Sequence, residues 1–165
     1  MTEMRIAIEE ANQEKVKPYG NLIDTEKAVP NAHGAVFDYW DGLGEMEIEG
    51  KISFGMVQSH PGPLVATNLE RHLKTSEGLI PITGDIVLVV GAATSNGHAD
   101  LSTVKAFRIP QGKAILLHPG TWHYVPLNQA QEVKTMVVFR FGTAQNDLHV
   151  DDFSKERNVT IQIFD

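Results

Sequence analysis

Residues 86–90 read Ile86-Val87-Leu88-Val89-Val90, an unbroken apolar run of strand length. A short run of aliphatic, mostly β-branched residues predicts a β-strand that is covered on both of its faces. Thr83-Gly84-Asp85 precedes the run and Ser95-Asn96-Gly97 follows it, and both triplets are rich in turn-forming residues. The middle of the chain is therefore predicted to be a fully buried strand.

Similar strand-length runs recur on both sides of this segment. They are Val36–Trp40, Lys51–Gln58, Gly78–Pro81, Val104–Ile109, Ala114–Leu117, Thr135–Phe141 and Thr160–Phe164. Short strands separated by Pro- and Gly-containing turns predict an all-β sandwich or barrel rather than βαβ units. Short helices are expected only near the ends, over Glu9–Val16 and Ser154–Arg157.

Length and composition narrow the class of protein. A chain of 165 residues with 42% hydrophobic residues predicts one globular domain, spanning 1–165. The net charge of −7 disfavours nucleic acid and anionic membranes as partners, so a small anionic substrate would need a local basic pocket. The lack of cysteine excludes disulfides, thiolate nucleophiles and Cys-based zinc sites. Because residues 1–12 have no apolar signal-peptide core and no run reaches membrane-spanning length, we expect a cytoplasmic protein.

The first segment rich in possible ligands contains Glu70, His72 and Glu77. In an extended chain, residues two apart point to the same face, so Glu70 and His72 would share a face that Arg71 does not. If that face looks into a barrel, both side chains approach a ligand from one strand. A polar surface hairpin is the competing interpretation.

The second segment is His118-Pro119-Gly120-Thr121-Trp122-His123. Pro119-Gly120 predicts a tight turn that can bring the returning strand back over the first segment. Trp122 and His123 would then face opposite sides, which leaves Trp122 to pack and His123 to meet Glu70 and His72. Alternatively, His123 is a core histidine bonded to a backbone carbonyl.

Other polar groups are assigned no site. His33, His98 and His149 lie in polar stretches of sequence, and Asp147, Asp151 and Asp152 are expected to form a solvated face.

The two segments together resemble the paired motifs of the cupin superfamily. The first motif appears as His72-x4-Glu77-x6-Gly84, with Glu70 where the pattern usually has a histidine, and the second as Gly120-x-x-His123. The chain also resembles the ureidoglycolate lyase family over most of its length. The matching stretches are Lys17-Pro18-Tyr19-Gly20, Leu69-Glu70-Arg71-His72, Ile80-Pro81-Ile82-Thr83-Gly84, Asp100-Leu101-Ser102-Thr103-Val104-Lys105-Ala106-Phe107, Thr121-Trp122-His123 and Arg140-Phe141-Gly142-Thr143. Departures are Tyr124, where relatives can carry a second histidine, and Glu77, where some carry glutamine.

This resemblance implies a cupin-type double-stranded β-barrel (jelly roll) that splits ureidoglycolate into glyoxylate and urea. It also implies a homodimer and a divalent metal, nickel in the resembled family. Imidazole and carboxylate groups suit such a metal, and the predicted ligands are His72, Glu77 and His123.

The reaction requires a group to hold the substrate carboxylate and groups to move protons. Arg140 is the first candidate for the carboxylate because a guanidinium can bind it bidentately, with a surface ion pair as the alternative. Arg71 and Lys105 are further candidates, and Trp122 and Tyr124 are expected to line the pocket. His72 or His123 suits the proton transfers, with Glu70 as a third catalytic group.

Two other functions remain open from the sequence. One is a related cupin enzyme that acts on another small hydroxy acid or sugar acid. The other is a non-catalytic cupin that binds a small acid without converting it.

Overall fold

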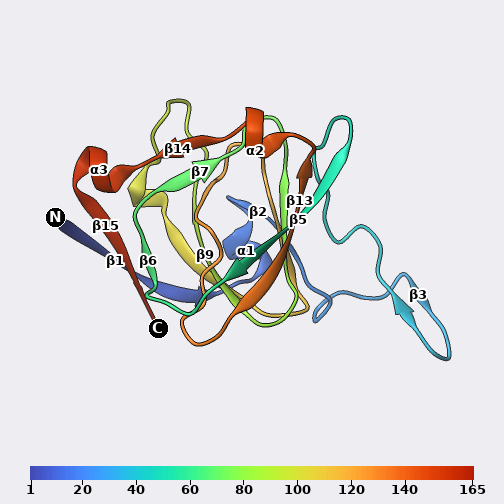
Figure 1. Cartoon of the computed structure of the whole chain (residues 1–165). Helices are drawn as coiled ribbons and strands as arrows, with labels where there is room; N and C mark the ends of the chain where they lie inside the picture. The colour runs from blue at the N-terminus through green and yellow to red at the C-terminus, as the bar shows by residue number, and fades with distance from the viewer.

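The computed structural model describes residues 1–165 and shows the all-β fold that the sequence predicts. Two curled sheets enclose the interior (Figure 1). The larger sheet has eight strands in the order β14-β7-β12-β9-β10-β1-β15-β6, and the smaller has five in the order β2-β11-β8-β13-β5. From β7 onward the chain passes repeatedly between the two sheets, which is the connectivity of a barrel.

Seven strands follow predicted runs to within two residues, whereas β1, β3, β6 and β14 lie outside every predicted run. The larger sheet contains β1 (Thr2–Glu10), β6 (Val65–Ala66), β7 (Leu69–Arg71), β9 (Ile86–Gly91), β10 (Lys105–Ile109), β12 (Trp122–His123), β14 (His149–Asp151) and β15 (Val159–Phe164). The smaller sheet contains β2 (Gly20–Ile23), β5 (Ile52–Ser59), β8 (Glu77–Pro81), β11 (Ala114–Leu117) and β13 (Val133–Arg140). The helices are short: α1 (Gln13–Val16), η1 (Leu101–Thr103), α2 (Thr143–Asn146) and α3 (Phe153–Arg157). None is long and apolar enough to cross a bilayer.

Strand β9 separates two hydrophobic clusters. Ile86, Leu88 and Val90 face the cluster between the two sheets, with residues of β2, β8, β10, β11 and β13. Val87 and Val89 face a second cluster, called here the outer hydrophobic cluster, with residues of β6, β7, β10, β12, β15 and α3. Every residue of β9 is buried, which confirms the prediction of a strand covered on both faces.

The N-terminal segment differs from the prediction. A helix was expected over Glu9–Val16, but β1 runs to Glu10 and only Gln13–Val16 is helical. Strand β1 lies between β10 and β15 and pairs with both in parallel, so long-range pairing outweighs local helix preference. The helix begins where the Asn12 side chain accepts a hydrogen bond from the Lys15 backbone N–H.

A two-stranded hairpin, β3 (Ala32–His33) with β4 (Asp38–Tyr39), extends away from the barrel (Figure 1). The predicted strand Val36–Trp40 is therefore shorter than expected and lies in this arm. Val36 is 94% exposed, and Phe37 and Tyr39 are more than half exposed. The arm thus presents apolar side chains that its own barrel does not cover.

Candidate functional site

Three strands bring the predicted ligands together. Glu70 lies on β7 and His123 lies directly opposite it on β12 in an antiparallel pair. Residues opposite one another in such a pair share a face of the sheet, so both side chains point to the same side. Glu77 begins β8 on the facing sheet, and His72 follows β7 directly. The turn at Pro119-Gly120 is present, with φ of +84° at Gly120, and its backbone N–H donates to the His72 carbonyl.

Distances define the cluster of Glu70, His72, Glu77 and His123, called here the barrel cluster. The Nε2 atoms of His123 and His72 lie 2.7 and 3.4 Å from the same carboxylate oxygen, Oε2 of Glu77. Glu70 completes the group, with its Oε1 3.7 Å from Nε2 of His123. The two imidazole rings are tilted against one another with their centroids 5.3 Å apart.

Backbone carbonyls orient both imidazoles. Nδ1 of His72 lies 2.8 Å from the carbonyl oxygen of Asp147, and Nδ1 of His123 lies 3.0 Å from that of Thr121. A carbonyl can only accept, so each Nδ1 carries a proton and each Nε2 is directed into the cluster. This is the arrangement by which proteins hold metal-ligating histidines.

The barrel cluster is highly charged for a buried group. Burial lowers the pKa of His123, but the Glu77 carboxylate outweighs burial and raises that pKa to about 9. Burial likewise raises the pKa of Glu77, but the two imidazoles outweigh it and lower the pKa to about 2. For His72 burial is again opposed by Glu77, and its pKa lies above the ordinary value. Without a metal, therefore, Glu77 is ionised and His123 is protonated at neutral pH.

Access to the barrel cluster is restricted. The side chains of His72, Glu77 and His123 are buried, whereas 30% of the Glu70 side chain is exposed. Phe139 on β13 packs edge-on against the His72 ring, with centroids 5.6 Å apart. A small ligand would therefore approach from the side of Glu70 and meet an apolar wall behind the imidazoles.

Asp147 supports the cluster, although the sequence predicted it on a solvated face. That prediction is wrong, because the Asp147 side chain has no exposed area. Its carboxylate accepts hydrogen bonds from the backbone N–H groups of Leu73 and Lys74, at 3.0 and 2.8 Å. Asp147 thereby fixes the loop that follows His72, while its carbonyl orients the His72 ring. No local sequence signal marks this role.

Four of the predicted substrate-binding residues lie away from the barrel cluster. Arg71 points to the opposite face, where its guanidinium donates to the carbonyls of Thr94 and Asn96 and stacks over the Trp122 ring at 4.4 Å. Trp122 is fully buried in the outer hydrophobic cluster, and Tyr124 packs against the same cluster. Lys105 is half exposed and pairs with Glu9 at 3.3 Å. The structure does not bring these side chains to the cluster.

Arg140 lies at the end of β13, next to Phe139. Its Nη2 donates to Asn146 Oδ1 at 2.7 Å, and its Nε is buried without a hydrogen-bond partner. The guanidinium therefore has unused donor capacity at the end of β13, but it leaves the strand on the face opposite Phe139 and the barrel cluster.

The donor set of the barrel cluster fits a divalent metal ion. Oε2 of Glu77 and Nε2 of His123 are both buried and lie 2.7 Å apart, and neither has a hydrogen bond to any other group. The ligand atoms of Glu70, His72 and His123 also lie within 4.8 Å of one another. Two imidazole nitrogens and a carboxylate with free lone pairs are common ligands of catalytic transition metals.

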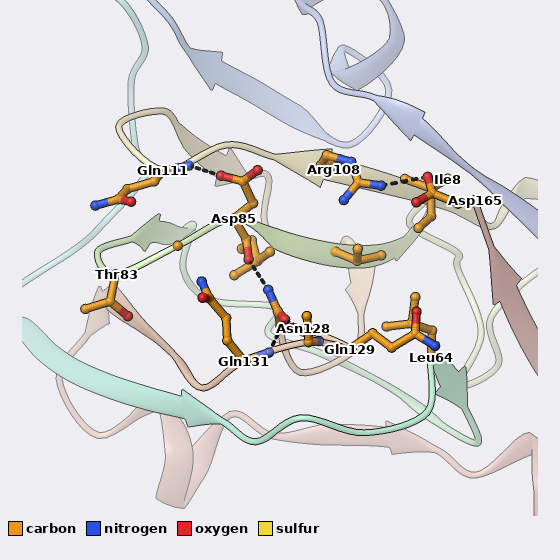
Figure 2. A pocket seen from close by; sticks show the side chains of 14 residues that line it. Ile8, Leu64, Thr83, Asp85, Arg108, Gln111, Asn128, Gln129, Gln131 and Asp165 are labelled. Atoms are coloured by element: carbon orange, nitrogen blue, oxygen red, sulfur yellow. Dashed lines mark hydrogen bonds and ion pairs between the residues drawn. The ribbon is translucent and has the colours of Figure 1, made fainter.

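The larger clefts of the protein lie elsewhere. Figure 2 shows one of about 450 Å³ at the opposite end of β9, lined by Asp85, Arg108 and several amide side chains. Its charged groups already have partners: Asp85 accepts from the Gln111 N–H and from the Asn128 amide, and Arg108 pairs with Asp165 at 2.7 Å. It offers no unpaired buried titratable group, so we place the candidate site at the barrel cluster.

Fold and site together define a cupin-type β-barrel with a buried histidine–carboxylate centre. A family model described as ureidoglycolate lyase matches residues 3–162 of the chain. The ureidoglycolate lyase of Escherichia coli O1:K1 / APEC is 28% identical over 148 residues, which cover 87% of this chain and 91% of that protein. The chain therefore belongs to the ureidoglycolate lyase family.

Solved structures of oxalate decarboxylases also resemble the barrel. The Lactobacillus farciminis enzyme in its formate complex is 20% identical, with a TM-score of 0.43, over 64% of this chain. The Bacillus subtilis enzyme is 19% identical, with a TM-score of 0.41, over 53% of this chain. The matched parts span only 27% and 21% of those longer chains.

Proposed function

We propose that the protein cleaves ureidoglycolate to glyoxylate and urea at the barrel cluster. The observation that carries this proposal is the convergence of two Nε2 atoms on the Glu77 carboxylate, with both Nδ1 atoms held by backbone carbonyls. It occurs in a chain that the ureidoglycolate lyase family matches over residues 3–162.

The reaction needs a positioned substrate and two proton transfers. The hydroxyl of ureidoglycolate loses its proton, its oxygen forms the carbonyl of glyoxylate, and the carbon–nitrogen bond breaks. The departing nitrogen keeps the bonding electron pair and takes up a proton to become urea. A single carboxylate can accept the first proton and deliver the second, and positioned acid–base catalysis of this kind is typically worth about 10²- to 10⁴-fold in rate.

We assign both proton transfers to Glu70. It is the most exposed carboxylate of the barrel cluster and lies beside His123, so it can reach a bound substrate from the solvent side. His72, His123 and Glu77 would hold a divalent metal, for which the resembled family implies nickel. When bound, such an ion acts as a Lewis acid toward the hydroxyl or carboxylate oxygen. The apolar Phe139 wall limits water around the reacting groups.

Arg140 remains our candidate for the substrate carboxylate. Its Nε has no partner, and a guanidinium suits bidentate binding of a carboxylate. Arg140→Lys keeps the charge but removes the planar fork, so we expect KM to rise more than kcat falls.

The test is to incubate purified protein with ureidoglycolate and quantify glyoxylate and urea separately. We expect equal amounts of both products, loss of turnover with chelator, and recovery when a divalent metal returns. Turnover of another 2-hydroxy acid but not of ureidoglycolate would instead support a different cupin enzyme. Ligand-induced thermal stabilisation without product would support a non-catalytic binding protein.

We also propose that the protein forms a homodimer. The outer face of the edge strand β5 exposes Ile52, Phe54 and Met56, and Phe54 is 70% exposed. The hairpin β3–β4 also extends from the barrel (Figure 1), with exposed apolar side chains of its own. Exposed apolar edges of this kind favour association, and a two-fold pair would let each copy cover the other.

Light scattering coupled to size exclusion tests the dimer directly. We expect twice the mass of one chain for the wild type and one chain mass for Phe54→Asp. A monomeric wild type at micromolar concentration would refute the dimer without affecting the proposed reaction.

A further inference from the structure

A second group of possible metal ligands lies outside the barrel, at the corner where β14 and α3 meet the loop after β9. It consists of His98 in that loop, Asp151 at the end of β14 and Glu156 in α3, called here the corner cluster. All three donor atoms lie within 4.8 Å of one another. His98 and Glu156 are each more than half exposed, whereas the Asp151 side chain has no exposed area.

The sequence predicted Asp151 on a solvated face, and that prediction is wrong because its side chain is buried. Oδ2 of Asp151 accepts two hydrogen bonds, from the Ala99 N–H and from Arg157 Nη2, both at 2.7 Å. Its Oδ1 is buried and has no hydrogen-bond partner. A buried carboxylate oxygen without a partner costs free energy, so its orientation toward His98 indicates a missing ligand.

The contacts of the His98 ring with the two carboxylates are longer than hydrogen bonds. Nδ1 of His98 lies 3.6 Å from Oδ1 of Asp151 and 3.6 Å from Oε2 of Glu156. Both separations exceed the roughly 2.7–3.2 Å of a hydrogen bond. In a tetrahedral zinc site with bonds of about 2.0–2.1 Å, however, neighbouring ligand atoms are about 3.4 Å apart. The two distances from His98 are therefore close to those between neighbouring ligands of a cation, and the third pair of atoms lies within 4.8 Å.

The backbone around the corner cluster is well fixed. The His98 N–H donates to Asn96 Oδ1 at 3.0 Å, and its carbonyl accepts from Thr94 Oγ1 at 2.7 Å. The same loop accepts the Arg71 guanidinium through two carbonyls. Because the loop backbone and Asp151 are both held, only the exposed side chains of His98 and Glu156 need to adjust on binding. Arg157 occupies Oδ2, which leaves Asp151 as a one-oxygen ligand.

We propose that His98, Asp151 and Glu156 bind a zinc-like divalent cation through one nitrogen and two oxygens, with solvent in the fourth position. The ion links the loop after β9 to α3 across the outside of the larger sheet. This site shares no ligand with the barrel cluster and does not depend on the proposed reaction.

Zinc titration of the full-length protein, followed by NMR of the histidine side chains, tests the site residue by residue. We expect the His98 ring signals to shift and saturate with zinc. Glu156→Gln and His98→Asn should each weaken binding here by more than about 100-fold, the upper end of what loss of even an outer-shell partner costs. Since both side chains are exposed, the two variants should remain folded.

The chain offers a matched control in the exposed pair His60 and Glu132, whose Nδ1 and Oε1 lie 3.1 Å apart without a buried carboxylate beside them. Glu132→Gln should leave the zinc response of His98 unchanged. The proposal is overturned if zinc shifts only His72 and His123, or if Glu156→Gln binds zinc at His98 as tightly as the wild type. Neither result would bear on turnover of ureidoglycolate.

Discussion

Replacing Glu77 by glutamine removes the charge at the centre of the barrel cluster while it keeps the shape of the side chain. The Glu77 carboxylate contacts the Nε2 atoms of both imidazoles, and all three side chains are buried. The prediction concerns protein freed of metal by a chelator, because the ion pair and a bound metal use the same atoms.

The pKa values give the size and the pH range of the effect. The rise in the His123 pKa from 6.5 to about 9 corresponds to about 3 kcal/mol in favour of imidazolium in the folded protein. A raised pKa in the folded state stabilises fully below pH 6.5, and the contribution is lost as the pH rises through about 9. The lowered pKa of Glu77 reflects the same ion pair. Its contribution to stability is lost as the pH falls from 4.5 through about 2, because Glu77 then becomes protonated.

Urea unfolding measures the consequence. Between pH 4.5 and 6.5 we expect Glu77→Gln to unfold with a free energy about 3 kcal/mol lower than the wild type, in line with loss of one partner of a buried pair. Above pH 9 the difference should close or reverse, because neutral His123 leaves the wild-type carboxylate buried without a counter-charge. Glu132→Gln, in an exposed pair, serves as control. A difference under about 1 kcal/mol at every pH would refute the reasoning.

Three further substitutions test hydrogen bonds that hold loops and helix α3 in place. Arg71→Met leaves two loop carbonyls without donors and should lower the free energy of unfolding in urea by about 2–4 kcal/mol; an unchanged midpoint would contradict this. Asp147→Ala leaves two backbone N–H groups beside His72 unpaired and should lower both stability, by about 2 kcal/mol, and turnover; unaltered turnover would mean that the loop does not position the imidazole. Asp152→Ala removes the N-cap of α3 and should cost about 1 kcal/mol in thermal unfolding while turnover stays at the wild-type level.

Residue spacing and turn chemistry predicted the all-β barrel and the approach of Glu70 and His123, whereas the resemblance to cupins implied that His72 and Glu77 join them. Alternation along β7 places Glu70 on one face and Arg71 on the other, and the Pro119-Gly120 turn brings His123 back opposite Glu70. The uniform apolar run of β9 likewise fixed its burial on both faces. These features depend on residue spacing and on turn chemistry.

What the sequence missed depends on contacts between distant segments. Asp147 and Asp151 look like solvated acids, but backbone N–H groups from residues 73–74 and 99 make their burial possible. Strand alternation correctly placed the Arg71 side chain on the face opposite Glu70. Its hydrogen-bond partners, the carbonyls of Thr94 and Asn96, could not be predicted from residue spacing. The helix expected from Glu9 was replaced by strand pairing with β10 and β15.

The rate of urea release from ureidoglycolate by the wild type, by Glu70→Gln and by His123→Gln, each shown to be folded, tests the central claim most directly. The account predicts stoichiometric glyoxylate and urea from the wild type. It also predicts a loss of about 10²-fold or more in Glu70→Gln, and no metal-dependent turnover in His123→Gln. Wild-type rates in both variants would show that the reaction takes place elsewhere in the protein.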